Sequence, residues 1–223
     1  MIGPAERPGF GRPLRGYPGN GVKFLLVSAV ALCAVLSGTA GASLFEYDRE
    51  LGTIARATLW SATSPDRRVA RKDVLKVYVR CYRDKRAFEH VFEHRYGMPA
   101  ARVLAYYAGG SDVYLRSTTC DNVRAFVRGR HTIHTAAAYS ILLHETLHRQ
   151  GVRHERITTC LANDAVRWGA EWLGFTETKA LRARNLALEF TRLYAPANYK
   201  MGKPNCLLLS RRTDWPDHRV PVR

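Results

Sequence analysis

The sequence predicts an α+β fold, because strand patterns occupy the first half of the chain and helical patterns occupy the second half. Apolar and polar residues alternate over residues 73–82, and a further strand pattern at 102–116 surrounds a Gly-Gly turn. From about residue 135 onward, apolar residues recur at helical spacing. The chain has 223 residues, of which 46% are hydrophobic, so it is long enough for one domain with a buried core.

Local signals place the individual elements along the chain. A short helix is predicted before residues 64–66, and the strand at 73–82 follows it. Asp84 is a favourable helix N-cap and Gly97 a helix stop, so the residues between them predict a helix that ends near Tyr96. The two strands of 102–116 come next. Further helices are predicted after Cys120, at 135–150, at 158–173 and at 177–194.

The first 42 residues predict a signal peptide, or an N-terminal membrane anchor that stays uncleaved. Residues 24–36 form an apolar core of signal-peptide length after a basic stretch, and Ala40 and Ala42 fit an A-x-A cleavage site. The core is shorter than the roughly 20 apolar residues of a membrane span, but the small residues after it extend it nearly to that length. We therefore expect a secreted, extracellular protein or a membrane-anchored one, with a domain at 43–210 and a basic tail at 211–223.

The formal net charge of +16 predicts attraction to anionic partners. Candidate partners are an anionic cell-envelope polymer and a lipid surface. No nucleic-acid-binding motif is present, so we expect no specific nucleic-acid partner, and nothing in the sequence predicts the oligomeric state.

The cysteines predict two disulfides. Cys33 belongs to the predicted signal peptide, which leaves an even number of cysteines in an oxidising compartment. Proximity in the sequence favours the pairs Cys81–Cys120 and Cys160–Cys206, while the two other pairings of these cysteines stay open.

The stretch LLHETLHRQGVRHE, residues 142–155, predicts a metal site. His144 and His148 are four residues apart on a predicted helix, so both imidazoles lie on one face and can bind one metal ion. Glu145 follows the first histidine and can reach a water molecule at the ion. Gly151 permits the left-handed turn that ends a helix, after which the chain can return His154 to the same ion.

A catalytic zinc ion usually takes three protein ligands and keeps one position open, so the two helical histidines need a third ligand. His154 is the first candidate from the spacing. The helical pattern that follows it makes Glu155 and Asp164 competing candidates, in that order.

Residues 144–154 resemble the long zinc signature HExxHxxGxxH of the metzincin clan of metallopeptidases. The resemblance implies a zincin-like fold, with a small mixed sheet, a backing helix, an active-site helix and a helical C-terminal part. It also implies that an edge strand, here 111–117, holds an extended peptide substrate. Metzincins carry a methionine turn after the motif. Met201 is the only later methionine, and its neighbours do not reproduce that turn.

The motif therefore predicts an exported, zinc-dependent metallopeptidase that hydrolyses a peptide or protein substrate. Zn²⁺ would bind His144, His148 and His154, and Glu145 would be the general base that accepts a proton from the attacking water. Two alternatives stay open. One is a basic, disulfide-bonded surface-binding protein with a structural or inactive metal site, and the other is a zinc amidase that acts on cell-wall material.

Two further histidine groups are predicted not to bind metal. His90, Glu93 and His94 fit an inverted zinc pattern but fall opposite the apolar face of their helix, which indicates a solvent-exposed surface. His131 and His134 stand at the start of a predicted helix, where capping or exposed positions are expected.

Overall fold

The structure is a computed structural model that describes residues 43–63 and 74–200, all within one compact unit. The predicted signal peptide or anchor, Met201 and the basic tail lie outside these residues. No helix in the described ranges is long and apolar enough to cross a bilayer.

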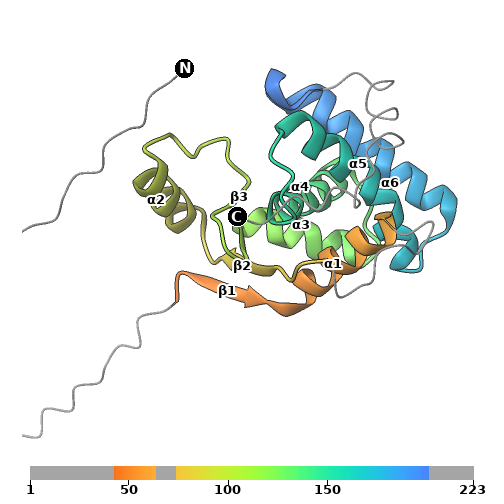
Figure 1. The fold of residues 1–223 in the computed structure, drawn as a ribbon, viewed down its shortest axis with the longest axis horizontal. Helices are drawn as coiled ribbons and strands as arrows, with labels where there is room; N and C mark the ends of the chain where they lie inside the picture. Colours follow the sequence, from red (N-terminus) through yellow and green to blue (C-terminus); the bar gives the residue numbers. More distant parts are fainter. Residues whose placement is uncertain (1–42, 64–73, 201–223) are drawn as a thin grey trace, which may run out of the picture. The chain divides into compact units, whose positions relative to one another are not determined.

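The sheet has four strands in the order β1-β2-β4-β3 and is mixed, as predicted (Figure 1). β1 is antiparallel to β2, β2 is parallel to β4, and β3 is antiparallel to β4. The sequence pattern located three of these strands and missed β1. The strand bounds are β1 Phe45–Asp48, β2 Tyr78–Tyr82, β3 Ala105–Tyr107 and β4 Asp112–Leu115.

The prediction that 111–117 forms the edge strand is wrong. β4 lies inside the sheet, because it pairs with β2 on one side and with its hairpin partner β3 on the other. Gly109 and Gly110 have positive φ angles of 92° and 66°, which suits the tight turn between β3 and β4. The hairpin leaves β3 at one edge of the sheet, with β1 at the other.

The helices confirm most of the predicted elements. Asp84 accepts a hydrogen bond from the Ala87 backbone N–H at the start of α2, and Gly97 ends that helix with a φ of 65°. The helix predicted before 64–66 is longer than expected, and the one predicted after Cys120 begins before that cysteine. The bounds are α1 Arg49–Thr63, α2 Lys85–Tyr96, α3 Ser117–Val127, α4 Ile133–Arg149, α5 Glu155–Trp172, α6 Glu177–Tyr194 and the 3₁₀ helix η2 Ala197–Tyr199.

Helix α4 occupies the centre of the fold (Figure 1). It packs against α3, α5 and α6 and against strand β3, and Leu142, Leu143 and Leu147 on it are almost completely buried. The Tyr139 hydroxyl of α4 hydrogen-bonds Thr58 of α1, and Gly169 of α5 lies directly against both side chains. The metal-site motif therefore begins on a helix that is fixed from several sides.

A second, aromatic cluster joins α2 to the sheet. Phe88 and Phe92 of α2 pack against Tyr82 and Tyr106, whose hydroxyl oxygens are 3.0 Å apart. Burial raises the pKa of Tyr106 well above its usual value. The cluster fixes α2 beside strand β3.

The Cys81–Cys120 disulfide is confirmed and joins β2 to α3. Such a bond indicates an oxidising, extracellular location. Cys160 is buried and disulfide-bonded. Cys206 lies outside the described residues, so the Cys160–Cys206 pairing stays a prediction.

Candidate metal centre

Two histidines of α4 form the base of the candidate centre. His144 and His148 are one helical turn apart, and their ring centroids are separated by 4.6 Å. The two Nε2 atoms face each other at 3.0 Å. The i, i+4 spacing places both rings on one face, as the motif predicted.

The end of α4 determines which nitrogen of His148 is available. Gly151 has a φ of 95°, its N–H donates to the His148 carbonyl, and the N–H of Val152 donates to the Leu147 carbonyl. These bonds form a Schellman motif, which confirms Gly151 as the helix stop. The turn brings the Val152 carbonyl within 2.7 Å of His148 Nδ1. A carbonyl only accepts, so Nδ1 carries the proton and Nε2 presents its lone pair to the centre.

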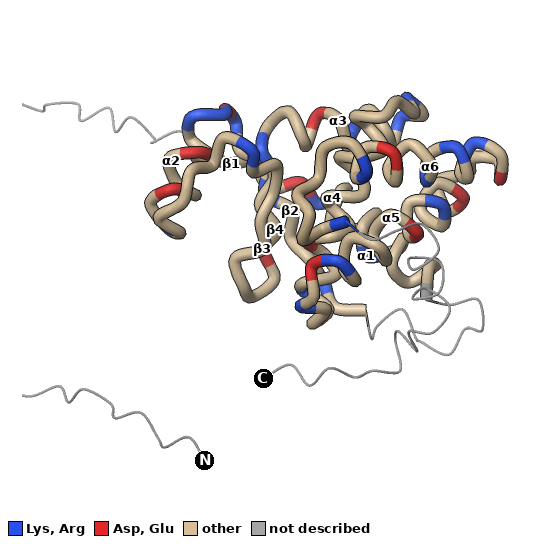
Figure 2. The backbone as a smooth tube through the Cα atoms, turned by 90° about the horizontal axis from the view of Figure 1, so that it is seen from above, with Lys and Arg blue, Asp and Glu red and all other residues tan. Residues whose placement is uncertain are grey.

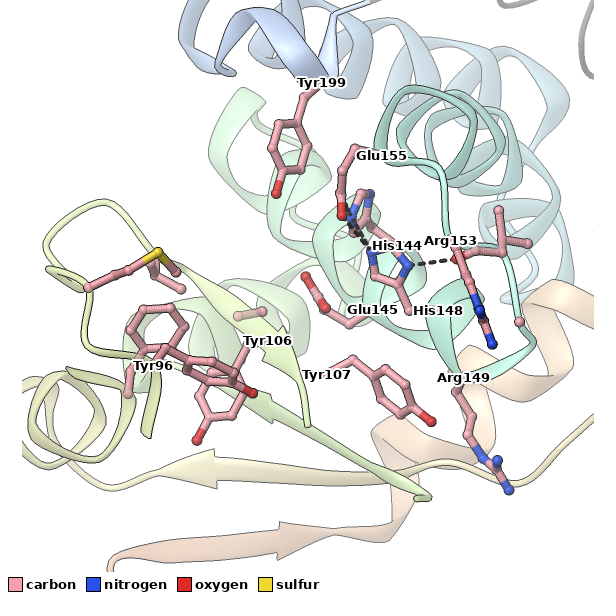
Figure 3. A pocket seen from close by; sticks show the side chains of 16 residues that line it. Tyr96, Tyr106, Tyr107, His144, Glu145, His148, Arg149, Arg153, Glu155 and Tyr199 are labelled. Atoms are coloured by element: carbon pink, nitrogen blue, oxygen red, sulfur yellow. Dashed lines mark hydrogen bonds and ion pairs between the residues drawn. The ribbon is translucent and has the colours of Figure 1, made fainter. Parts of the chain in front are cut away.

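Glu155 offers a third potential ligand atom. Its Oε2 lies 3.0 Å from His144 Nε2, and its Oε1 lies 3.5 Å from His148 Nε2. Ligand atoms of His144, His148 and Glu155 all lie within 4.8 Å of one another, and this group could hold a metal ion (Figure 3). The hydrogen bond from His144 lowers the pKa of Glu155, so the carboxylate is charged at neutral pH.

The donor set fits a zinc ion. His144 Nδ1 lies 3.2 Å from the Thr159 hydroxyl, and in the tautomer that donates to this hydroxyl, its Nε2 also presents a lone pair. Burial lowers the pKa of His144, which favours the neutral, metal-binding form. Without an ion, the Nε2–H of His144 donates to Glu155, and a metal ion would take the place of that proton, with His144 in the tautomer whose Nδ1–H faces Thr159. Tetrahedral zinc with bonds of about 2.05 Å holds its ligand atoms about 3.3 Å apart, close to the separations seen here.

His154, the first candidate from the spacing, is not brought to this group. It is the exposed N-cap of α5, with a φ of −87° and a ψ of 111°. Helix α5 begins directly after it, three residues earlier than predicted, so Glu155 shares the inward face with Thr158 and Thr159. The other candidate, Asp164, pairs instead with Arg184 of α6, with 2.6 Å between Oδ1 and Nε.

Glu145 lies beside the three ligands without belonging to their group (Figure 3). Burial of its carboxyl group, helped by the nearby charge of Glu155, raises the pKa of Glu145 to about 8. A hydrogen bond from the Tyr107 backbone N–H opposes this rise. The carboxyl group is therefore held at the edge strand β3 and is mostly protonated at pH 7.

Tyr199 is a site residue that the sequence did not reveal. It belongs to η2, stacks on His144 with 5.6 Å between ring centroids, and donates its hydroxyl to the Glu155 carboxylate. Burial and the charges of Glu155 and Glu145 raise the pKa of Tyr199 to about 12, so the hydroxyl keeps its proton. No local pattern marks a lone tyrosine so far along the chain from the motif.

The centre opens into a cleft of about 590 Å³. One wall is apolar and comes from α2, the segment after it and strand β3, with Phe92, Tyr96, Met98 and Tyr106 among its residues. The last residue of α4, Arg149, and Arg153 of the segment after it also line the cleft. The cleft therefore combines the metal-ligating group, an apolar wall and two cationic side chains.

The two other histidine groups join no metal group within the described ranges. His90 and His94 are exposed on α2, and the Glu93 carboxylate accepts a hydrogen bond from the Ala100 backbone N–H. His131 packs between the rings of Phe126 and Phe175. The exposed positions of His90 and His94 agree with the prediction of a solvent-exposed face. His131 differs from the prediction, because it neither caps α4, whose N-cap is Thr132, nor lies exposed.

The comparisons with known proteins identify no relative. No protein-family model matches the chain, and neither a curated protein nor a solved structure matches it. The resemblance to metzincins therefore rests on the motif, and the structure supports it only as far as a possible metal group on a helix.

Proposed function

We propose that the protein is a zinc-dependent metallopeptidase of an oxidising, extracellular compartment. One observation carries this proposal. His144, His148 and Glu155 converge on one point of a cleft, and the carboxyl group of Glu145, which is not part of their group, stands next to them. A purely structural site would not require that additional carboxyl group.

Zinc is the metal that the donor set favours. Two imidazole nitrogens and one carboxylate oxygen form a set used by catalytic zinc sites, in which three protein ligands leave one coordination position open. When bound, zinc would supply Lewis acidity, which makes water more acidic and polarises a substrate carbonyl.

Glu145 is the proton carrier in this proposal. The Tyr107 N–H orients its carboxylate toward the cleft, where it can accept a proton from water and later donate it to the leaving amine. Its raised pKa suits both transfers, because a group that titrates near neutral pH can accept and release a proton.

Tyr199 and Thr159 position the metal ligands. The Tyr199 hydroxyl holds the Glu155 carboxylate, while Thr159 and the Val152 carbonyl contact the Nδ1 atoms of the two histidines. Such partners fix the ring orientation and the tautomer of a ligating histidine.

The free edge of β3 suits an extended peptide. Ala105 and Tyr107 line the cleft, and β3 pairs with a strand on one side only. A substrate chain can add to such an edge through backbone hydrogen bonds. In this proposal, residues 105–107 bind the extended substrate, a role that the resemblance implied for residues 111–117.

The test compares wild type with Glu145→Gln and His148→Ala. We expect one zinc ion per chain in wild type and Glu145→Gln, and turnover of a peptide library that falls by roughly 10²–10⁴ in Glu145→Gln. His148→Ala should lose zinc and turnover together. Metal analysis and mass spectrometry of the digest measure both quantities. Equal cleavage by wild type and Glu145→Gln, or a wild type without zinc, would contradict the proposal.

A further inference from the structure

We propose that the cleft selects peptides that carry a large apolar or aromatic side chain on one side of the scissile bond and a carboxylate on the other. This inference rests on the proposed function for the cleavage step, but the recognition itself can be measured without hydrolysis.

The apolar wall is open to a ligand. Tyr96 is 38% exposed and Met98 is 55% exposed, although both line a cleft whose inner surface is aromatic. The Tyr96 ring packs at 4.8 Å from the Phe92 centroid and at 5.7 Å from the Tyr106 centroid. The wall is therefore preformed, and an incoming apolar side chain would remove its exposed surface from water.

The basic wall has unused hydrogen-bond donors. Among the described residues, Arg149 Nε is buried and has no hydrogen-bond partner, and neither Arg149 nor Arg153 forms an ion pair. Elsewhere in the described ranges, several arginines do pair with carboxylates, as Arg80 does with Asp112 and Arg184 with Asp164. Both arginines line the cleft, so guanidinium groups without an acidic partner among the described residues are suited to bind a carboxylate from a ligand.

The two walls lie on opposite sides of the metal-ligating group. In Figure 3, Tyr96 and Tyr106 stand to one side of Glu145, while Arg153 stands on the other side beside His148. Arg149 lies on that same side but farther from the ligands, past Tyr107. A peptide that crosses the centre in an extended conformation would meet both walls. The carboxylate can come from an acidic side chain or from the free C-terminus of the peptide.

Binding to zinc-loaded Glu145→Gln tests the inference without turnover. The probes are fluorescent peptides that contain Phe and Glu in both orders around a central bond. Matched peptides replace Phe by Ala or Glu by Gln, and each occurs with a free and an amidated C-terminus. Anisotropy should show that losing either feature weakens binding about tenfold. The amidated series distinguishes an acidic side chain from a C-terminal carboxylate.

Variants of exposed residues locate the two walls. In the Glu145→Gln background, Met98→Ser and Tyr96→Ser should remove the preference for Phe and keep the preference for the carboxylate. Arg153→Glu should remove the carboxylate preference alone. Arg86→Glu is the control, because Arg86 is exposed on α2, does not line the cleft, and makes the same charge change. It should bind all peptides as the parent does.

The outcomes separate this inference from the proposed function. The inference is wrong if peptide affinity depends on neither the Phe side chain nor the carboxylate. It is also wrong if the wall variants keep these preferences, even when wild type cleaves peptides. In another outcome, Glu145→Gln binds the peptides selectively while zinc-loaded wild type hydrolyses none of them. That result contradicts the proposed peptidase activity but supports the inferred peptide recognition.

Discussion

At the residue scale, the adjacent side chains of His154 and Glu155 have different environments. His154 is exposed at the N-cap of α5, whereas Glu155 is the first residue of that helix and lies 3.0 Å from His144. A negative charge in the first turn is also favoured by the helix dipole. Glu155, which the start of α5 turns inward, is therefore the better candidate for the third ligand.

This difference predicts opposite results for two matched variants. Glu155→Ala should weaken zinc binding by about 100-fold or more, because it removes a ligand. His154→Ala should change the affinity little. Competition with a chromophoric chelator measures both constants. The reverse result would mean that His154, rather than Glu155, is the third zinc ligand, as the motif predicts.

A second prediction at this scale concerns the metal-free protein. The pKa of Glu145 is raised from 4.5 to about 8, so keeping this group ionised costs folding free energy at neutral pH. The stability that the protonated Glu145 carboxyl group contributes to the folded state is complete below pH 4.5 and is lost as the pH rises toward 8. Metal-free Glu145→Gln should therefore be more stable than metal-free wild type by about 2–4 kcal/mol near pH 7.5.

Urea unfolding in the presence of a chelator, from pH 4.5 to 8, measures this difference. The advantage of Glu145→Gln should shrink toward zero at the acidic end, where the carboxyl group is protonated in both states. A difference that does not depend on pH would contradict the assignment, because it would have to come from packing alone.

At the scale of elements, the contact of α5 with α1 and α4 depends on Gly169. A Cβ atom at this position would collide with the Tyr139 hydroxyl and with Thr58, which are hydrogen-bonded to each other. Alanine is favoured over glycine in a helix by about 1 kcal/mol, but overpacking of a core costs about 1–3 kcal/mol. Gly169→Ala should therefore be destabilising overall, which thermal unfolding can measure. Gly97→Asn, at an open helix stop, serves as a control with little expected effect.

The disulfide between β2 and α3 is a second contact at this scale. Cys81 and Cys120 are separated by 39 positions, and closing a loop of that length stabilises a protein by about 2–4 kcal/mol. The double variant Cys81→Ala/Cys120→Ala should lose about that much stability in denaturant unfolding. The zinc affinity should change far less, because neither cysteine lines the cleft. A loss of zinc equal to that of His148→Ala would contradict this separation.

At the scale of the whole molecule, a metal ion would connect α4 to α5, because the ligands come from both helices. A ligand that binds only the folded state at 1,000 times its dissociation constant stabilises it by about 4 kcal/mol. Chelation should therefore lower the unfolding temperature of wild type, and re-addition of zinc should restore it. His148→Ala should show no such response. An equal response in wild type and His148→Ala would place the stabilising metal elsewhere.

The charge of the molecule also acts at this scale. The chain carries a formal charge of +16, and Figure 2 shows Lys and Arg spread over several elements, with acidic residues among them. A distributed charge of this kind attracts anionic polymers or lipid through a field that salt screens. The attraction to an anionic cell-envelope surface stays a proposal, separate from recognition in the cleft.

The sequence by itself determined the features that depend on neighbours along the chain. The helical pair His144 and His148, the adjacent Glu145 and the stop at Gly151 follow from a period of 3.6 residues and from the left-handed conformation that glycine adopts easily. The bounds of α6 and the caps of α2 follow from the same local rules. Proximity in the sequence also predicts the Cys81–Cys120 disulfide.

Only the tertiary structure decided the features that depend on how distant segments meet. Glu155 joins His144 and His148 in the candidate group because α5 begins at that residue and packs its inward face on α4. A shift of one position would rotate the carboxylate away. Strand β3 is the edge because β4 pairs with β2, a choice between segments far apart in the chain. Tyr199 reaches His144 through the return of the chain after α6. Local periodicity carries no information on such contacts, because they are set by long-range packing and pairing.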